Sequence, residues 1–347
     1  MSEGKEKEIN SLFSKITKVL AFIGVTMLCL LVILLGVVWV FEKGPAPSVT
    51  AAFCKSMRET SALKFIPGIF LKDEEIDAFK SVSTEEADTA EVNTSLIRIS
   101  DSGNTGSGEP AFKVIDIASG TCKGKLMIVR DPKRVTLGVS DQFAFMPGLE
   151  LTEMVKKYDA VAGINAGGFK DEGGQGNGGT PEGLVIHDGE IIWGDGILSY
   201  NVVGLDGAGV LIVGTMTGYE AVEAGVVNGV SFKTYDGLAS SLIINGEVQE
   251  QNLGSGVNPR TAIGQRSDGA ILLLVLDGRS INTLGATMND VVDIMLEYGA
   301  VNAGNLDGGS SSVMVYNGEI INNCASVTGP RKIPTGFLVL KEDHADA

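Results

Sequence analysis

The sequence predicts an α+β fold, in which one mixed β-sheet domain with few helices follows an N-terminal transmembrane helix and a helical stalk. The chain has 347 residues and 46 glycines without a triplet period, a composition typical of many tight turns between short strands. Short β-branched runs alternate with Asp-Gly and Asn-Gly dipeptides, which favour hairpin turns. One long apolar segment near the N-terminus carries no charged residue. Strands outnumber the helices that the pattern shows, which favours α+β over a helical bundle.

The first element is the apolar segment at residues 19–41, which we expect to be an uncleaved transmembrane anchor. About 20 helical residues cross the hydrocarbon of a bilayer, whereas the apolar region of a secretory signal is only about 7 to 15 residues long. A cleaved signal peptide is the alternative, because Pro45-Ala46-Pro47 offers a small residue nearby. Basic residues concentrate before the segment, which predicts a cytoplasmic tail at 1–18 and an extracellular C-terminal domain at the cell membrane.

Residues 42–110 follow the anchor and are expected to form a stalk with short helices. The apolar spacing at 51–64 and at 72–82 permits two helices, and the composition of 100–108 predicts a loop. We interpret this region as a spacer that holds the domain off the membrane.

Residues 111–340 are expected to form one domain, with a polar tail at 341–347. Thr152 begins a short helix, and Thr287 begins a second one, which Gly299 ends. The expected strands are the runs 114–117, 126–129, 161–164, 184–186, 210–213, 242–244, 271–276, 313–315 and 337–340.

The composition excludes several classes of function. With a formal net charge of −16, the chain lacks the basic stripe that a nucleic-acid groove needs. The chain has only two histidines, His187 and His344, which disfavours a Ser-His-Asp catalytic triad and a metal site made of several histidines. Outside the anchor, Cys54, Cys122 and Cys324 allow at most one internal disulfide. We expect no cofactor and no catalytic metal, although Asp and Asn oxygens can hold a structural calcium ion.

Two acidic residues follow expected strands and are candidate catalytic groups. Asp277 follows the apolar run 271–276, but the Asp-Gly that it begins is also the commonest turn of this chain, which favours a plain turn. Asp307 lies in the small-residue run 302–312, whose backbone N–H groups can cradle an anion, and here function and a plain turn are equally favoured. A capped helix between the two acids can return the second to the neighbourhood of the first.

Two further segments carry groups suited to an anionic ligand. In Asn258-Pro259-Arg260-Thr261 the arginine suits bidentate phosphate binding, although a lone arginine is more often a surface charge. Asn165-Ala166-Gly167-Gly168-Phe169 follows an expected strand, and five glycines at 173–179 can form either a flap over a pocket or a plain loop. This glycine-rich stretch lacks the Gly-Lys-Ser/Thr of a P-loop.

In their order along the chain, these segments resemble the phosphodiester glycosidase family. The matching segments are Asn165-Ala166-Gly167 with Phe169, Pro181-x-Gly183, 258–264, 277–279, and 305–309 with Ser311-Ser312. The resemblance covers about residues 111–340, and the combination is specific although each piece is not. Three positions depart from the family: Gly168 replaces a common aromatic, Ser310 a third glycine, and Thr335-Gly336 an Asn-Ala. The anchor and stalk resemble those of membrane-anchored bacterial members, which implies a cell-envelope setting.

The resemblance implies hydrolysis of a sugar-1-phosphodiester at its glycosidic bond, which leaves a free sugar and a phosphomonoester. One carboxylate would stabilise the oxocarbenium-like transition state, a second would handle protons, and an arginine would neutralise the leaving phosphate. The residues that the family implies are Asp277 and Asp307 as catalytic groups, and Asn165, Gly167, Glu182, Arg260, Thr261, Arg279, Gly308, Gly309 and Ser311 as substrate-binding groups.

Two other classes of function remain. A non-catalytic module of the cell envelope would bind an anionic glycopolymer, such as an exopolysaccharide, or a partner protein. It would keep Arg260 and Arg279 but would not require both Asp277 and Asp307. A hydrolase with a serine nucleophile among 310–312 would lack a histidine base.

Overall fold

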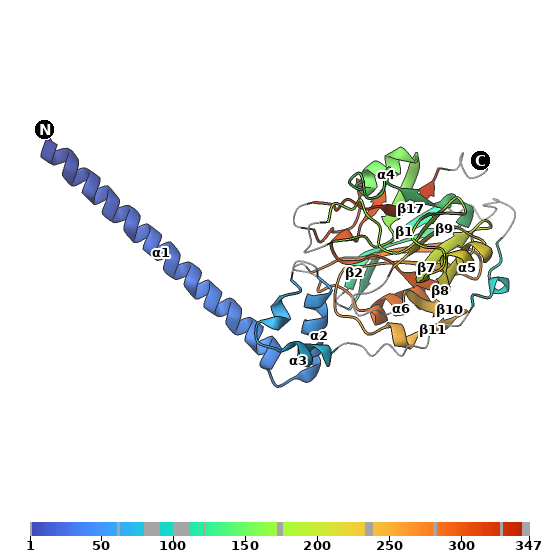
Figure 1. Cartoon of the computed structure of the whole chain (residues 1–347), viewed down its shortest axis with the longest axis horizontal. Helices are drawn as coiled ribbons and strands as arrows, with labels where there is room; N and C mark the ends of the chain where they lie inside the picture. Colours follow the sequence, from blue (N-terminus) through green and yellow to red (C-terminus); the bar gives the residue numbers. More distant parts are fainter. Residues whose placement is uncertain are drawn as a thin grey trace.

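Figure 1 shows one long helix projecting from a domain that contains all the strands. The computed structural model describes residues 2–60, 63–79, 91–99, 111–120, 122–171, 176–232, 239–279, 283–326 and 329–341, with the backbone alone for 2–11. The long helix is α1 (Ser2–Lys43), and its part Leu12–Lys43 contains a stretch of 18 residues with a mean hydropathy of 2.9. Among the described residues it is the one helix long and apolar enough to cross a membrane, a test that a signal sequence also passes.

The segment after α1 folds back against the end of that helix. Its elements are α2 (Pro47–Arg58), η1 (Ile66–Gly68), α3 (Asp73–Asp77) and η2 (Thr94–Leu96). Pro47 occupies the first turn of α2, where its missing N–H has no helical partner to lose. The rings of Phe41 and Phe53 stack at 5.0 Å, and Thr50 Oγ1 donates to Phe41 O. The two expected stalk helices are therefore present but short, and the loop expected at 100–108 lies outside the described residues.

The strands form three sheets. The first has the order β1 (Phe112–Ser119), β2 (Cys122–Val129), β13 (Ile271–Leu276), β12 (Arg260–Arg266), β14 (Ala300–Asn305), β10 (Ser241–Ile244), β11 (Glu247–Val248). The second has the order β16 (Glu319–Ile320), β15 (Met314–Tyr316), β4 (Ala160–Asn165), β17 (Thr335–Leu340), β3 (Val135–Val139). The third has the order β6 (Glu190–Trp193), β5 (Val185–His187), β9 (Val226–Ser231), β7 (Ser199–Asp206), β8 (Leu211–Thr217). The strand pairs within these sheets are antiparallel, so the described strands form three antiparallel sheets where the sequence suggested one mixed sheet. The predicted α+β class with few helices is confirmed.

Three of the predicted turns have the geometry that Asn-Gly and Asp-Gly favour. Asp188, Asn245 and Asn317 have φ values of 52°, 55° and 51°, and each is followed by a glycine that also has a positive φ. Two successive positive φ values define a type I′ turn, whose twist matches that of a hairpin. These turns join β5 to β6, β10 to β11, and β15 to β16.

The main core lies between the sheets and draws on all three. Ile263 and Leu273 from the first sheet pack with Phe337 from the second and with Val203 and Val230 from the third. β13 reads as an unbroken apolar run because it is buried on both faces. Its other face packs against α6 (Met288–Glu297), while α4 (Leu151–Lys157) and α5 (Gly218–Glu223) pack on the second and third sheets.

α6 begins and ends as predicted. Thr287 Oγ1 accepts a hydrogen bond from the Asp290 N–H, and the Asp290 carboxylate accepts one from the Thr287 N–H. Gly299 follows with a φ of 83°, a conformation that stops helices and favours glycine. None of the four cysteines is in a disulfide, so the single disulfide that the sequence allowed is not formed.

Candidate active site

The edges of two sheets meet where most of the predicted site residues lie. Because β12 is antiparallel to both β13 and β14, the ends of β13 and β14 and the start of β12 share one edge. Arg260 begins β12, Asp277 directly follows β13, and Asp307 lies two residues after β14, so all three lie at this edge. In the second sheet, β4 ends at Asn165 beside the start of β17 at Thr335.

Asn165 connects the two edges. Its Oδ1 accepts hydrogen bonds from Thr261 Oγ1 at 2.9 Å and from the Val313 N–H at 3.1 Å. Its Nδ2 donates to Asp307 O at 2.6 Å, and the Asp307 N–H donates to Ala166 O at 2.9 Å. Asn165 and Thr261 are both buried. The side-chain oxygen and nitrogen of Asn165 therefore both form hydrogen bonds within the protein. Asn165 thus fixes the backbone of Asp307.

Asp307 is the acid whose environment suits proton transfer. It is partly exposed, yet desolvation by the surrounding atoms raises the pKa of its carboxyl from 3.8 to about 7. The Ser311 hydroxyl and the charge of Arg331 lower this pKa, whereas the charges of Asp171 and Glu182 raise it. A carboxyl with a pKa near neutral can give up or accept a proton under ordinary conditions.

Arg331 is the cation of this site. Its Nη1 and Nη2 donate to the two oxygens of Asp171 at 3.2 and 2.8 Å, a bidentate pair. Nη1 also donates to Ser310 Oγ at 3.1 Å and Nη2 to Gly176 O at 3.0 Å. The guanidinium carbon lies 5.2 Å from the ring centroid of Phe169. The side chains of Arg331 and Asp171 are 13% and 17% exposed, so the pair is largely shielded from bulk water.

The sequence reasoning did not identify Arg331 or Asp171 as site residues. The two are 160 positions apart, and neither stands in a segment with a recognisable local pattern for ligand binding. The one hint in the sequence is that the segment 331–334 directly precedes Thr335-Gly336, a position at which this chain departs from the family.

Arg260 has a different set of partners from the one expected. Its Nε donates to Ala286 O at 3.1 Å, and its Nη2 donates to Glu59 Oε2 at 2.8 Å and to Gly256 O. The side chain is only 8% exposed. This geometry does not favour the prediction that Arg260 binds phosphate, because its guanidinium already donates hydrogen bonds to oxygens of the protein.

Arg279 lies near Arg260, as the sequence suggested. Its Nη2 donates to Val257 O at 2.8 Å, and the residue is exposed. Desolvation lowers the pKa of its guanidinium, Glu59 raises it, and Arg260 lowers it, so the three charges share one neighbourhood. Its role as a phosphate ligand stays a prediction.

Asp277 lies at the same edge as Asp307 but has other neighbours. Its Oδ1 accepts a hydrogen bond from the Asn323 N–H at 2.9 Å. Desolvation raises the pKa of its carboxyl, while hydrogen bonds from Asn323 and Asn322 and the charges of Lys125 and Lys123 lower it. The strands before the two acids are separated by β12, which corresponds to roughly 10 Å between backbones at the usual strand spacing. A shared pocket for the two acids stays a prediction.

The predicted glycines lie where backbones approach closely. A Cβ on Gly308 would lie 2.8 Å from Pro259 O, and one on Gly167 would lie 3.0 Å from Val230 Cβ. Gly309 has a φ of 63°, and its N–H donates to Pro259 O at 3.0 Å. These positions shape the backbone beneath Asp307, and a side chain at Gly308 would push it away from β12.

Glu182 lies close enough to Asp307 for its charge to raise the pKa of that carboxyl. Its N–H donates to Gly168 O at 2.9 Å, and its side chain is exposed. Gly168, where the family commonly has an aromatic, lies against Phe232, since an added Cβ would be 3.3 Å from the Phe232 ring. Gly168 therefore packs between Phe232 and Glu182, whose Cβ would lie 3.9 Å from the added atom.

Within the described part of the chain, no group of three or more His, Cys, Asp and Glu side chains can hold a metal ion. The calcium expectation also involved Asn and backbone oxygens, and it stays a prediction.

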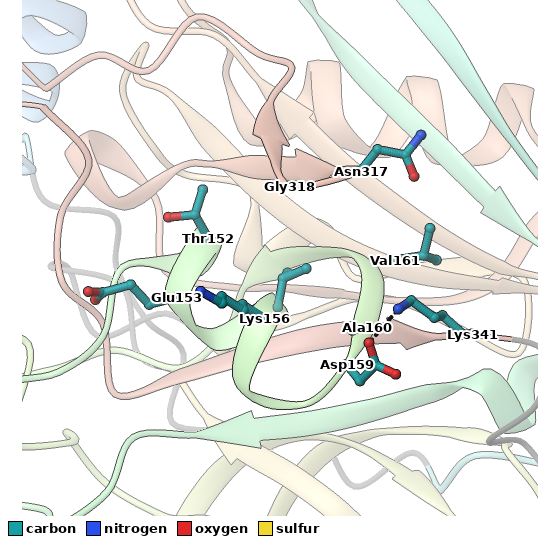
Figure 2. A pocket seen from close by; sticks show the side chains of 10 residues that line it. Thr152, Glu153, Lys156, Asp159, Ala160, Val161, Asn317, Gly318 and Lys341 are labelled. Atoms are coloured by element: carbon teal, nitrogen blue, oxygen red, sulfur yellow. Dashed lines mark hydrogen bonds and ion pairs between the residues drawn. The ribbon is translucent and has the colours of Figure 1, made fainter.

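A groove of about 580 Å³ lies at the opposite end of the second sheet. Figure 2 shows the side chains that line it. It is lined by α4, by the start of β4 at Ala160, by the turn after β15 and by Lys341 beyond the end of β17. The Asp159 carboxylate and the Lys341 ammonium form an ion pair within it. β4 and β17 separate this groove from the edge at Asn165, so it is not part of the candidate site.

Three comparisons with known proteins bear on the family and the fold of this chain. The family model for phosphodiester glycosidases matches residues 158–340, more than half of the chain. The SPbeta prophage-derived uncharacterized protein YomE of Bacillus subtilis (strain 168) is 29% identical over 204 residues, which cover 56% of this chain but only 30% of YomE. The catalytic domain of zebrafish N-acetylglucosamine-1-phosphodiester alpha-N-acetylglucosaminidase, solved as a form auto-inhibited by its pro-peptide, superposes with a TM-score of 0.55 and 21% identity. That match covers 68% of this chain and 85% of the zebrafish domain, and it supports the fold. The chain belongs to the phosphodiester glycosidase family, as the order of its motifs indicated.

Proposed function

We propose that the protein is an extracytoplasmic hydrolase that cleaves the glycosidic bond of a sugar-1-phosphodiester and releases a free sugar and a phosphomonoester. The observation that carries this proposal is the carboxyl of Asp307, whose pKa is raised to about 7 beside the Arg331 guanidinium. A proton-handling acid next to a fixed cation is what cleavage of a sugar from a phosphate requires.

In the proposed reaction, the bond between the anomeric carbon and the phosphate oxygen breaks, and water supplies the new oxygen at the anomeric carbon. Asp307 handles the proton that passes between water and the leaving group. Asp277, as an ionised carboxylate, stabilises the positive charge that develops on the sugar. Glu182, which is exposed and whose charge acts on Asp307, contacts the sugar.

Arg331 is the proposed phosphate ligand. Asp171 holds its guanidinium in a bidentate pair, which fixes the plane of the fork. A phosphate oxygen can replace Ser310 Oγ as acceptor from Nη1, since that hydroxyl can rotate to another partner. The charge of Arg331 would then neutralise the leaving phosphate in a site that is largely shielded from water.

The proposed location is the cell membrane, with a single pass through α1 and the domain outside. The length and hydropathy of α1 support this, and so does the excess of lysines in α1 before its apolar segment at residues 19–41. Protease added to intact cells should digest the domain and leave a membrane-bound fragment. A chain protected until lysis would contradict this orientation, and a soluble domain without α1 would indicate a cleaved signal.

The function is tested with the purified full chain in detergent and a panel of sugar-1-phosphodiesters. We expect release of free sugar together with a phosphomonoester, and loss of that release in Asp307→Asn. Asp188→Asn, in an exposed hairpin turn, is the matched control. Binding of glycopolymers or phosphodiesters without any release would instead identify a non-catalytic module of the cell envelope.

A further inference from the structure

The segment expected to be a spacer makes a specific contact with the candidate site through Glu59. This residue follows the last turn of α2, and its side chain is 11% exposed. Its Oε1 accepts a hydrogen bond from the Gly256 N–H at 2.8 Å. Its Oε2 accepts hydrogen bonds from Asn258 Nδ2 at 2.5 Å and from Arg260 Nη2 at 2.8 Å. One carboxylate from the membrane-proximal segment therefore receives three donors from a single loop of the domain.

The backbones of the two segments also touch. A Cβ on Gly256 would lie 2.4 Å from Ser56 N and 2.7 Å from Ser56 Cα, so a larger residue at Gly256 would separate them. Ser56 Oγ accepts a hydrogen bond from the Val257 N–H at 2.8 Å. Such close contacts form only when α2 and the loop lie in one fixed position relative to each other. A flexible spacer would make variable contacts instead.

The loop that Glu59 holds supports the segment that carries Asp307. Arg260 is the first residue of β12, and the preceding Pro259 O accepts a hydrogen bond from the Gly309 N–H at 3.0 Å. The same carbonyl oxygen would lie 2.8 Å from a Cβ on Gly308. A shift of the loop would therefore move Gly308 and Gly309, and Asp307 with them.

Charge makes Glu59 hard to replace. The Arg260 side chain is 8% exposed, and Glu59 is the acidic group that pairs with it. A buried guanidinium that loses its carboxylate partner is strongly unfavourable, so the loop would rearrange to expose Arg260 or find another acceptor.

We propose that Glu59 is a positioning residue for the candidate active site, which makes the membrane-proximal segment a working part of the enzyme. Glu59 holds Arg260 and the loop 256–260, and through Pro259 it sets the position of Gly308, Gly309 and Asp307. This inference rests on the proposed function for its catalytic meaning, whereas its structural content does not depend on any substrate.

The continuity of contacts extends to α1. Phe41 stacks on Phe53 in α2, and Lys43 pairs with Glu75 at 2.8 Å. The end of the proposed anchor, α2 and the loop 256–260 thus form an unbroken series of contacts that ends beneath Asp307. The site would keep a fixed orientation relative to the membrane.

The test compares Glu59→Gln with Glu74→Gln in the full chain in detergent. Gln keeps the size of Glu59 and removes its charge, and Glu74 is an exposed residue of α3 outside the described contacts with the loop 256–260. Hydrogen exchange measured by mass spectrometry should be at least about tenfold faster in peptides covering 256–260 and 305–311 of Glu59→Gln. Glu74→Gln should exchange like the wild type. The same rates for 305–311 in all three proteins would overturn the proposal.

Kinetics and a double substitution separate positioning from general stability. Glu59→Gln should lower kcat by about tenfold or more with a smaller change in KM, and Glu59→Asp should recover part of the loss. Arg260→Gln combined with Glu59→Gln should be no worse than either single variant, because both remove the same pair. Additive losses, or a rise in kcat in Glu59→Gln, would overturn the positioning role, the latter by showing that Glu59 blocks the site. If the wild type cleaves no phosphodiester, the proposed function fails, and the exchange experiment still decides the contact.

Discussion

Asp307→Asn should make the protein more stable at alkaline pH while it lowers turnover by about a hundredfold or more. The folded protein raises the pKa of this carboxyl above the ordinary value of 3.8, so folding favours the protonated form. Below pH 3.8 the group is protonated in both the folded and the unfolded state, and it costs nothing. As the pH rises from about 4 through 7, the folded protein must either hold a proton that the unfolded chain releases or ionise a desolvated carboxyl. The wild type therefore loses stability across this window, and the variant does not.

The size of the effect follows from the pKa. A rise from 3.8 to about 7 corresponds to about 4 kcal/mol, at roughly 1.4 kcal/mol for each pH unit. That value is an upper limit, because Asp307 is partly exposed and solvent screens its charge. We expect about 2 kcal/mol of extra stability in Asp307→Asn at pH 8. The Asn oxygen can still accept from Ser311, so the substitution removes the charge with little change in packing.

The assay is unfolding of the full chain in detergent by denaturant, at pH 4 and at pH 8, for the wild type, Asp307→Asn and Asp188→Asn. The stability difference between Asp307→Asn and the wild type should be larger at pH 8 than at pH 4 by about 2 kcal/mol. All other titrating groups are common to the proteins and cancel in this difference. Asp188→Asn, in an exposed turn, should show little dependence on pH.

Turnover provides the second half of the prediction. Loss of a group that transfers protons lowers rates by about a hundredfold or more, and the limb of the pH–rate profile near pH 7 should disappear in Asp307→Asn. A variant that keeps its turnover, or whose stability relative to the wild type is the same at both pH values, would refute the assignment of Asp307.

Three other predictions test the rest of the site. Asp277→Asn should lower turnover by about a hundredfold, since it removes the charge that stabilises the sugar cation, and normal kcat would leave Asp307 as the sole catalytic acid. Arg331→Lys should raise KM for the phosphodiester by about tenfold, because lysine cannot form the bidentate pair with Asp171. If Arg260→Lys raises KM and Arg331→Lys does not, the phosphate binds at Arg260, as the sequence suggested. Exhaustive chelation should leave turnover unchanged, and a loss that calcium restores would establish a metal requirement.

Much of the fold could be predicted because its elements carry local signals. The nine expected strands overlap strands of the structure, and the Asn-Gly hairpins and the capping box of α6 form as their residues dictate. β7 was missed because Gly204 and Asn201 interrupt its apolar residues, and β3 because Gly138 shortens its apolar run. Their strand conformation depends on pairing with neighbours in the sheet, which a local pattern does not show.

The candidate site was predictable only in part. The sequence places Asp307, Asn165 and Thr261 at or just beyond the ends of buried strands. These strand ends lie close together in the fold, so the three residues contact one another. Arg331 and Glu59 could not be found in this way. Each depends on a partner 160 or more positions away. The local sequence around each residue does not distinguish it from the other Arg and Glu residues of the chain. Arg260 was recognised as important from its motif, but the motif did not show that its charge is already paired.

Two ion pairs that are largely shielded from water lie next to the segment 307–311. Glu59 and Arg260 lie beneath Gly308 and Gly309 through Pro259, and Asp171 and Arg331 lie beside Ser310. Buried pairs of this kind are a weak source of stability, because desolvation of both charges offsets most of their attraction. They do fix geometry, since a guanidinium bound to several acceptors has few alternative positions. The desolvated carboxyl of Asp307 and the two pairs are thus features that a chain selected for stability alone would replace with apolar side chains. Their presence together at one edge of the sheets is the strongest structural argument that this edge performs chemistry.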